Sequence, residues 1–402
     1  MKPKSERDCP FCQTDHLGTS KVLPLLPVPW PQVKGRGGRK KHISTAGYFC
    51  PNPNCAYLGV TDERVHALVG DGFHGKTEPI QDFYCQACNK KFTARRHTVL
   101  YRLKTPSSVV EKILWLLALG VDISVLEEVF GISEGTIRTW LCRSGEQGRK
   151  LHERFIIELE LVHIQLDELW TDAKHHGQEL WVWVASDAKT KLIPVIQVGG
   201  RTQAVAYRMV HELKDRLCTD CIPVFSTDGL KHYFYSLTAH FGKWERVEGK
   251  QKPVWVLLNE FVYGRVVKCH RRRKLVQVER QVLCGEKEAY RTRLKAAGLS
   301  GRINTSFVER INLTLRQCIS KLARRSWGLA QFTPELVDPI EGWRAYYHFV
   351  RYHESPEVEM AVPIQRRGKQ PPQKYRRRTP TIAAGLTRKR WTVMEVISYP
   401  LP

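Results

Sequence analysis

The stretch "SFVERINLTLRQ", residues 306–317, decides the fold of the larger part of the chain. Its apolar residues recur at helical spacing, and with the residues that follow they mark one face of a helix: Phe307, Ile311, Leu315, Ile319 and Leu322. Glu309, Asn312 and Arg316 share a different face, because they lie three and seven residues apart. A single carboxylate on such a face is usually only solvated. Its meaning depends on what the rest of the chain places opposite it.

The segment before this helix reads as a mixed sheet. From about residue 160 the apolar period is two, and "LVHIQLDELW", "ELWVWVASD" and "KLIPVIQVGG" predict three consecutive antiparallel strands. "TQAVAYRMVHELKDRL" then predicts a helix, "CIPVFSTDGL" a strand and "KHYFYSLTAHFG" a second helix. This order is typical of an α/β, RNase H-like core with helices on the faces of the sheet. We place this catalytic domain at residues 160–355.

Two carboxylates occupy special positions in these strands. Asp167 lies within the first strand and Asp228 at the carboxyl end of the fourth, and side chains that leave adjacent strand ends converge in a crevice. The face of the helix that carries Glu309 could close over them. Three carboxylates would then hold two Mg²⁺ or Mn²⁺ ions for phosphodiester chemistry, because these ions prefer hard oxygen ligands. Arg316 would contact phosphate, and Asn312 would lie between it and Glu309.

Two other segments carry basic residues. Residues 241–303 interrupt the pattern, and we interpret them as a strand-rich insertion. Its basic run contacts the DNA backbone or is a solvated charge run: Arg271, Arg272, Arg273 and Lys274. Residues 356–402 are basic and Pro-rich, which favours a flexible tail that binds phosphates or only keeps the chain soluble.

A helix-turn-helix is predicted within residues 101–150. "DISVLEEVFGISEGTIRTWLCRSGEQ" reads as a short helix, a turn opened by Gly131, Ser133 as N-cap, and a second helix whose Ile137 and Trp140 face inward. The second helix of such a unit enters the major groove of DNA. Its candidate contacts are Glu134, Thr136, Arg138, Thr139 and Arg143. The alternative is an ordinary helical hairpin inside a larger bundle.

The first hundred residues contain half of the cysteines. Six of the twelve lie before residue 90, in the short pairs "CPFC", "CPNPNC" and "CQAC". The last two pairs predict a zinc ribbon over residues 1–100, in which four thiolates hold one structural Zn²⁺: Cys50, Cys55, Cys85 and Cys88. Chance pairing of buried cysteines is the alternative. Cys9 and Cys12 would need histidines such as His16 or His42 to complete a second site.

Composition points to a polyanionic partner. Lys and Arg number 64 against 40 acidic residues in 402, a formal charge of +24, which favours double-stranded DNA over a small acidic substrate. The charge alone does not distinguish this partner from two alternatives, a soluble protein that is merely basic and a protein associated with ribosomes. No apolar run reaches the roughly 18 residues that a membrane span needs, so we expect a protein that stays in the cytoplasm.

"LDELW", "STDG" and "SFVERINLTLRQ" together resemble the DDE transposases of the insertion-sequence-one group, over about residues 45–350. That family also carries a zinc ribbon followed by a helix-turn-helix. The resemblance implies a catalytic triad of Asp167, Asp228 and Glu309, with Arg316 as the basic residue seven positions later. It implies a prokaryotic, nucleoid-associated enzyme that cuts the element's ends, after which the freed 3′ hydroxyl attacks target DNA without a covalent protein intermediate. Joining two ends would require a homo-oligomer on the DNA.

Two other classes of protein remain open from the sequence. One is a non-catalytic DNA-binding regulator, in which the zinc ribbon and the helix-turn-helix perform the whole function. The other is an RNase H-like nuclease that cuts DNA without joining it. This chain also departs from the short family members in its length, in the segment between Asp228 and Glu309, and in its basic end.

Overall fold

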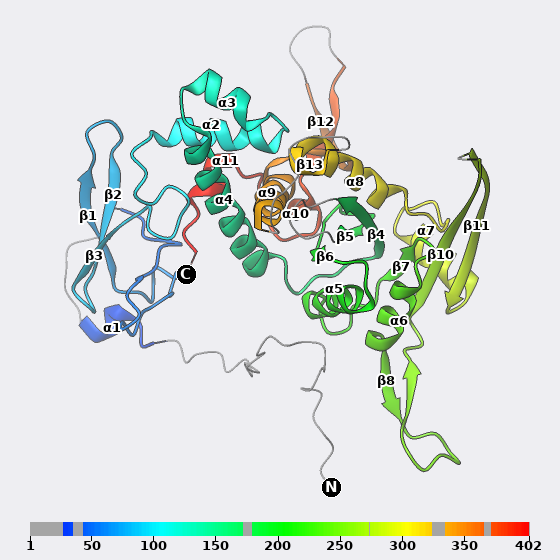
Figure 1. Ribbon diagram of the computed structural model, residues 1–402. Coiled ribbons are helices and arrows are strands. Elements are labelled where there is room, and N and C mark those ends of the chain that lie inside the picture. The colour runs from blue at the N-terminus through cyan, green and yellow to red at the C-terminus, as the bar shows by residue number, and fades with distance from the viewer. Residues whose placement is uncertain are drawn as a thin grey trace. The chain divides into compact units, whose positions relative to one another are not determined.

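The computed structural model describes residues 27–34, 43–171, 179–272, 274–323, 334–365 and 371–401 (Figure 1). The chain forms two compact units, Met1–Leu114 with Val393–Pro402, and Trp115–Thr392. Cys9, Cys12, His16, His42 and Arg273, all named in the sequence predictions, lie outside the described residues. Within the described ranges, no helix combines the length and the apolar character needed to cross a membrane.

A six-stranded mixed sheet forms the centre of the larger unit (Figure 1). Its spatial order is β11-β10-β7-β4-β5-β6. The three strands of this sheet that come first along the chain, β4, β5 and β6, pair antiparallel, as predicted. β7 then pairs parallel with β4, β10 parallel with β7, and β11 antiparallel with β10. The strand bounds are His163–Thr171 (β4), Leu180–Asp187 (β5), Val195–Gly199 (β6), Val224–Thr227 (β7), Val262–Arg271 (β10) and Lys274–Cys284 (β11).

Helices cover both faces of this sheet, because successive side chains of a strand point to opposite faces. On one face Leu166 and Trp183 pack in a core with the helices α5 (Gln203–Arg216) and α6 (Lys231–His240). On the other face Val184 packs with the helices α8 (Ser306–Cys318) and α9 (Pro334–Ala345). The helix α7 (Lys287–Ala296) packs against β10 through Tyr290 and Leu294. The larger unit is therefore an α/β structure with the sheet between helical layers.

The prediction that all of residues 241–303 form an insertion is wrong. β10 and β11 belong to the central sheet, and β10 continues it beyond β7 by four parallel pairs, from Val262↔Val224 to Arg265↔Thr227. Only the hairpin of β8 (Gly242–Glu245) and β9 (Val254–Leu257) forms a separate two-stranded sheet. Of the basic run, Arg271, Arg272 and Lys274 are exposed at the turn between β10 and β11.

The predicted helix-turn-helix region contains helices at the expected places. They are α2 (Ser107–Ala118), α3 (Ile123–Phe130) and α4 (Glu134–Phe155). Asp122 caps α3 and Gly131 ends it with a φ of 63°, a left-handed conformation that glycine adopts readily. Ile137 and Trp140 are buried, as predicted.

α4 extends well beyond the predicted unit. Its second half packs against α9, and two glycines allow the close approach: a Cβ on Gly145 would lie 2.5 Å from the Cα of Asp338, and one on Gly148 would lie 2.4 Å from the carbonyl oxygen of Glu341.

A buried ionic cluster joins α4, α9 and the segment that leads into β6. Glu341 accepts a hydrogen bond from Nδ1 of His152 at 2.8 Å and lies 3.3 Å from Arg344, whose Nε donates to the carbonyl of Ile193 at 3.0 Å. Burial acts to raise the pKa of Glu341, but Arg344 and His152 outweigh it and lower the pKa to about 2. Both partners of the ion pair are almost fully buried, so neither can exchange the other for water.

Replacing Glu341 by Gln is expected to lower the free energy of unfolding by about 3–5 kcal/mol, because Arg344 would be left buried without its counter-ion. Urea denaturation at neutral pH measures this loss. The matched control is Glu146→Gln, which breaks an exposed ion pair with Lys150 on α4 and should change stability by less than about 1 kcal/mol. Equal stability of the two variants would contradict the assigned role of the cluster.

The prediction of a flexible tail over residues 356–402 is also wrong for the residues that the structure describes. They include β12 (His353–Ile364) and β13 (Gln373–Arg378), which pair antiparallel, and α10 (Pro380–Ala383). The last helix, α11 (Val393–Ser398), buries its apolar residues in the smaller unit. The run "WTVMEVISYPL" supplies this apolar surface, which the basic residues before it obscure in the sequence.

The smaller unit is built on a three-stranded antiparallel sheet. Its elements are the short helix α1 (Trp30–Lys34) and the strands β1 (Leu68–His74), β2 (Ile80–Cys85) and β3 (Lys90–Thr93). Its core contains Tyr57 and Leu68 together with four cysteines. Tyr48 and Phe83 each lie two residues before a cysteine of the core, Cys50 and Cys85, and the centroids of their rings are 4.5 Å apart.

Candidate active site and cysteine cluster

The parallel register of β4 and β7 brings two predicted aspartates together. Leu166 is the partner of Thr227, so the next residues, Asp167 and Asp228, occupy neighbouring positions at the same edge of the sheet. Oδ1 of Asp228 accepts the backbone N–H of Leu230 at 3.0 Å, which holds this carboxylate at the start of α6. The two side chains come from strands that are far apart in the sequence but adjacent in the sheet.

A third acid, Glu168, joins this pair and was not predicted. Ligand oxygens of Asp167, Glu168 and Asp228 all lie within 4.8 Å of one another. The Glu168 side chain is only 2% exposed. Its carboxylate accepts hydrogen bonds from Nε and Nη2 of Arg201, at 3.0 and 2.5 Å, and from the hydroxyl of Tyr233 at 2.9 Å. The adjacent acids in "LDELW" are the sequence signal that could have identified it.

Glu309 lies beside this group and not within the 4.8 Å cluster. It is fixed in the first turn of α8, where it accepts hydrogen bonds from Lys268 and, at 2.5 Å, from the hydroxyl of Thr305. α8 itself is tied to β4, because Oε1 of Gln165 accepts the N–H groups of Phe307 and Val308 at 3.0 and 3.1 Å. Glu309 is close enough to Asp167 for its charge to raise the pKa of that aspartate.

The other two predicted residues of α8 differ in their roles. Asn312 is buried and donates from Nδ2 to Asp167 at 2.9 Å, while its Oδ1 has no hydrogen-bond partner among the described residues. Arg316 instead donates to the backbone carbonyls of Trp170 and Leu322, at 3.0 and 3.2 Å. Arg316 was predicted to contact phosphate, whereas these bonds hold the end of α8 against the end of β4.

The acid cluster concentrates negative charge in a partly buried place. Burial, then Asp228 and Glu168, raise the pKa of Asp167 to about 8. Burial and then Glu168 raise the pKa of Asp228 to about 6. For Glu309 burial acts in the same direction, but hydrogen bonds from Lys268 and Thr305 outweigh it and lower the pKa. Crowded carboxylates of this kind, with an unpartnered amide oxygen beside them, match the hard oxygen donors that Mg²⁺ and Mn²⁺ prefer.

Glu168→Gln is expected to weaken Mn²⁺ binding by about 10–100-fold, because it removes one negative charge from the cluster while keeping a side chain of the same size. Titration of free Mn²⁺ followed by electron paramagnetic resonance measures the affinity without DNA. Glu153→Gln, at an exposed position on α4, is the control for a simple loss of charge. Unchanged Mn²⁺ affinity in Glu168→Gln would show that this carboxylate acts only on Arg201 and Tyr233.

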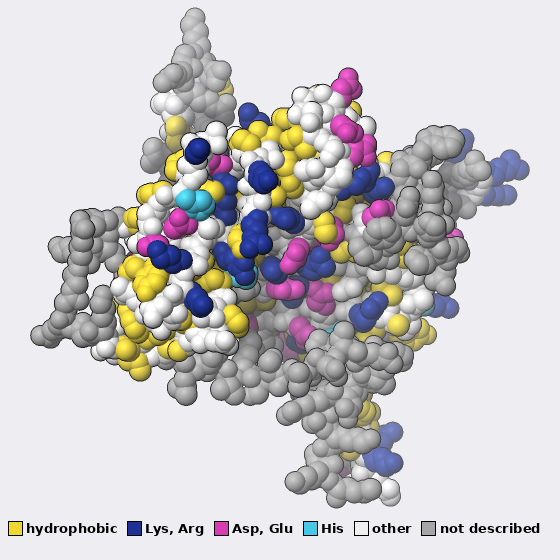
Figure 2. Space-filling model, turned by 60° about the vertical axis from the view of Figure 1, so that its left-hand side comes forward, with side chains coloured by type: hydrophobic (Ala, Val, Ile, Leu, Met, Phe, Trp, Pro, Cys, Tyr) yellow, Lys and Arg dark blue, Asp and Glu magenta, His cyan; other side chains and the backbone are white. Residues whose placement is uncertain are grey.

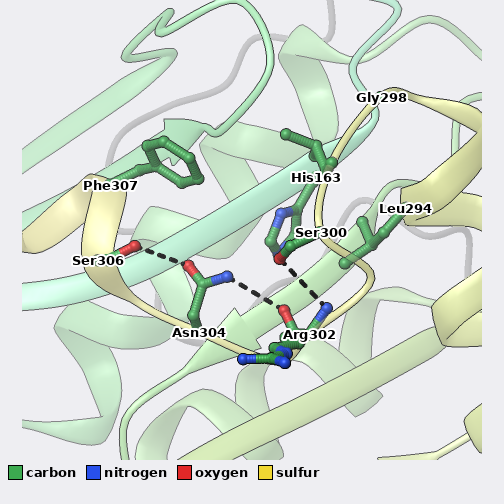
Figure 3. A pocket seen from close by; sticks show the side chains of 9 residues that line it. His163, Leu294, Gly298, Ser300, Arg302, Asn304, Ser306 and Phe307 are labelled. Carbon is green, nitrogen blue, oxygen red and sulfur yellow. Dashed lines mark hydrogen bonds between the residues drawn. The ribbon is translucent and has the colours of Figure 1, made fainter.

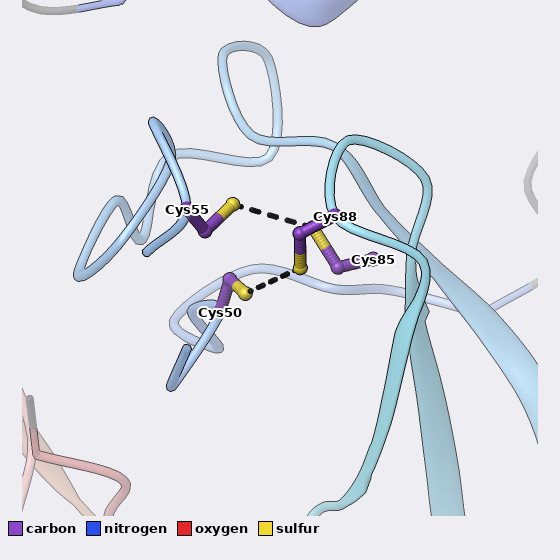
Figure 4. A group of neighbouring side chains, drawn as sticks. All are labelled: Cys50, Cys55, Cys85 and Cys88. Atoms are coloured by element: carbon purple, nitrogen blue, oxygen red, sulfur yellow. Dashed lines mark hydrogen bonds between the residues drawn. The ribbon is translucent and has the colours of Figure 1, made fainter. Parts of the chain in front are cut away.

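The four predicted cysteine ligands of the smaller unit are brought together (Figure 4). Their sulfurs lie within 4.8 Å of one another, with Cys50 and Cys88 at 3.5 Å and Cys55 and Cys85 at 3.8 Å. A tetrahedron with zinc–sulfur bonds of about 2.3 Å has edges of about 3.8 Å, so the spacing fits a structural Zn²⁺. Burial acts to raise the pKa of Cys88, but hydrogen bonds from Asn52 and its cysteine neighbours lower it to about 7, and the thiolate is the form that binds metal.

The residues predicted to contact DNA lie on the first half of α4. Thr136, Arg138 and Thr139 are exposed, and Glu134 and Arg143 are half-buried. Arg138 forms an exposed ion pair with Glu134 at 2.9 Å. On the face of the molecule in Figure 2, acidic side chains gather in a patch with Lys and Arg side chains around them.

No protein-family model matches the chain, and neither does any curated protein.

Proposed function

We propose that the protein is a transposase of the DDE type, which cuts DNA strands and joins their ends to target DNA in a reaction that requires a divalent metal ion. The observation that carries this proposal is the β4–β7 register, because it places Asp167 and Asp228 at one edge of the sheet with Glu309 beside them. Carboxylates on neighbouring strand ends and on a covering helix can hold the divalent ions that metal-dependent phosphodiester transfer uses.

The sheet topology supports an RNase H-like assignment. Three antiparallel strands are followed by a helix, a parallel strand, a second helix and another parallel strand, in the spatial order β6-β5-β4-β7-β10. The order of strands and helices agrees with the order expected from the sequence. The fifth strand of this order is β10, which lies in the segment that was predicted to be an insertion. Fold alone does not specify chemistry, so the proposal depends on the carboxylates at the edge of the sheet.

The protein's own side chains would prepare this site for DNA. Asn312 holds Asp167 through its amide, and Lys268 and Thr305 hold Glu309 in one orientation. Arg201 carries a positive charge at the rim, stacked 4.6 Å from the ring centroid of Trp181. Mg²⁺ or Mn²⁺, held by Asp167 and Asp228 with Glu309 or Glu168, would supply the charge that activates an attacking hydroxyl and stabilises the leaving oxygen. None of these residues needs to form a covalent bond to DNA.

DNA recognition is assigned to α4, with α3 as the first helix of a helix-turn-helix, and to the zinc ribbon. Replacing Arg138 by Ala should weaken DNA binding about tenfold, because one phosphate or base contact is lost. The slope of the logarithm of the binding constant against the logarithm of the salt concentration should fall in magnitude by about one. Fluorescence anisotropy over a range of salt concentrations measures both. Arg154→Ala, at the other end of the same helix, is the control, and an equal loss in both variants would argue against a specific role for the first half of α4.

The partners that follow are double-stranded DNA, as element ends and as target, and further copies of the chain. Two DNA ends must be joined in one reaction, so an assembly of at least two active sites is expected on the DNA. The +24 charge of the chain favours such binding through the phosphate backbone. The proposal places the protein with the nucleoid in the cytoplasm of a prokaryote.

The test is a strand-transfer assay. Purified protein is incubated with Mg²⁺ or Mn²⁺, a labelled DNA that carries its flanking inverted ends, and a supercoiled plasmid, beside a Glu309→Gln variant. Joined products with the wild type alone support the proposal. Cleavage without joining would favour the nuclease, and binding without cleavage in either protein would favour the regulator.

A further inference from the structure

Arg201 and Lys268 each bind one acid of the candidate active site. Arg201 donates to Glu168 through two nitrogens, whereas the ammonium of Lys268 donates to Oε1 of Glu309. Burial raises the pKa of Asp228, and the charge of Lys268 opposes this shift, so the ammonium lies near that aspartate as well. Lys268 is therefore a positive charge placed close to two of the carboxylates that are proposed to hold metal.

Lys268 comes from the part of β10 that runs past the end of β7. Arg265 is the partner of Thr227, the last residue of β7, so Lys268 lies three residues beyond this pair. Val266 packs in the core beside α7, and Lys268, two residues later, points to the same face of the strand and reaches Glu309. The side chains of Lys268 and Glu309 are 39% and 40% exposed. The ammonium can therefore leave this carboxylate for another acceptor without crossing a core.

Glu309, by contrast, is held in place by its helix. Figure 3 shows the loop that leads into α8, where the hydroxyl of Ser306 donates to Oδ1 of Asn304 at 3.0 Å. The same oxygen accepts a hydrogen bond from Nε2 of Gln165 of β4 at 2.9 Å, which ties the loop to the sheet. Glu309 also accepts the hydroxyl of Thr305 at 2.5 Å, a bond that does not depend on the ammonium. The carboxylate therefore stays at the cluster, and the ammonium is the partner that can move.

A divalent ion and the ammonium of Lys268 would compete for Glu309. An ion on either oxygen of a carboxylate that already binds an ammonium lies only a few ångströms from it, and the two positive charges repel. Even at the dielectric constant of water, this repulsion weakens ion binding about tenfold. A DNA phosphate offers the ammonium a different negatively charged acceptor, and the flexible stem of lysine, with three donors at its end, can make the exchange.

We propose that Lys268 is a switch that couples metal binding to DNA binding: its ammonium balances Glu309 until DNA binds, and then moves to a phosphate and leaves the carboxylate to the divalent ion. Metal and DNA then tighten the binding of each other by the same factor, because the coupling between two ligands is reciprocal. This inference rests on the proposed function, because it needs both ligands at the acid cluster. A lysine that only orients Glu309 predicts the opposite sign, since its loss would weaken the metal site.

The first test measures Mn²⁺ affinity without DNA, by electron paramagnetic resonance of the free ion. Lys268→Met keeps the length of the side chain and removes its charge, so it should bind Mn²⁺ about tenfold more tightly than the wild type. Lys268→Arg keeps the charge and should bind Mn²⁺ no more tightly than the wild type. Lys243→Met breaks an exposed ion pair with Glu245, at 2.6 Å on the β8–β9 hairpin, and is the control that should leave the affinity unchanged.

DNA binding supplies the second readout. Fluorescence anisotropy of a short labelled duplex gives the DNA affinity with and without Mn²⁺. The factor by which Mn²⁺ tightens DNA binding should be about tenfold smaller in Lys268→Met than in the wild type. Weaker or unchanged Mn²⁺ affinity in Lys268→Met, or equal factors in the two proteins, would overturn the switch and leave the proposed function standing. Failure of the wild type to bind Mn²⁺ would overturn both.

Discussion

Replacing Asp228 by Asn is expected to abolish strand cleavage and joining while leaving DNA binding intact. Asp228 and Asp167 are neighbours at the edge of the sheet, and an amide cannot balance the charge of a divalent ion as a carboxylate does. A loss of several kcal/mol of transition-state stabilisation corresponds to about a thousandfold or more in rate. Joined products from labelled DNA ends measure the rate, and anisotropy measures binding. A variant with at least a tenth of the wild-type rate would remove Asp228 from the active site.

The same variant should be more stable than the wild type when Mg²⁺ and Mn²⁺ are left out of the buffer. The folded-state pKa of Asp228, about 6, lies above the ordinary value of 3.8, so the folded state binds the proton more tightly than the unfolded state does. The free energy of unfolding therefore falls as pH rises from about 4 to about 6. Asn cannot lose a proton, so Asp228→Asn should gain on the order of 2–3 kcal/mol at pH 8 in a buffer without Mg²⁺ or Mn²⁺. A less stable variant would contradict the charge crowding described for the cluster.

Removing the zinc site is the second change with a large expected effect. Cys85 is fully buried and its sulfur lies 3.8 Å from that of Cys55, so Cys85→Ser would leave three ligands around a site that four should close. Structural Zn²⁺ contributes about 10–16 kcal/mol to the folding of small domains, far more than so small a core supplies. We expect the smaller unit to unfold in this variant, or in the wild type with a strong chelator.

Hydrogen exchange followed by mass spectrometry separates the two units. In Cys85→Ser, protection should be lost in β1, β2 and β3 and kept in β4 and β5, and the metal content should fall by one Zn²⁺ per chain. Cys142→Ser, at an exposed position on α4, is the control and should change neither. Full protection of β2 in Cys85→Ser without bound zinc would show that the cysteines pack as ordinary buried side chains.

Periodicity was sufficient to predict the strands that carry the site. The alternation in "LVHIQLDELW" and the short run before Asp228 identify β4 and β7, and the cysteine spacing identifies the four cysteines that lie together in the smaller unit. These features are local, so one sequence contains them. The pairing of Asp167 with Asp228 also follows once the two strands are placed side by side.

The remaining features depend on contacts that no local pattern contains. Glu168 follows Asp167 in "LDELW", but strand alternation sends the two side chains to opposite faces of β4, so the sequence does not show that both join one cluster. Arg201 and Tyr233 hold Glu168 there. The face of α8 that carries Arg316 could be predicted from helical spacing, but the bond that its guanidinium donates to the carbonyl of Trp170 could not. β10 pairs with β7, although a helix and a hairpin separate the two strands in the sequence. The apolar alternation within each strand does not indicate which other strand it pairs with.

The most direct test of the central claim is to locate the metal. Crystals soaked in Mn²⁺ and measured at the manganese absorption edge give an anomalous map that identifies the ion independently of the protein atoms. The account predicts a peak coordinated by carboxylate oxygens of both Asp167 and Asp228, and no such peak in crystals of Asp167→Asn. The account would be contradicted if crystals of the wild type, soaked at a Mn²⁺ concentration that supports DNA joining, showed no manganese peak between these two aspartates.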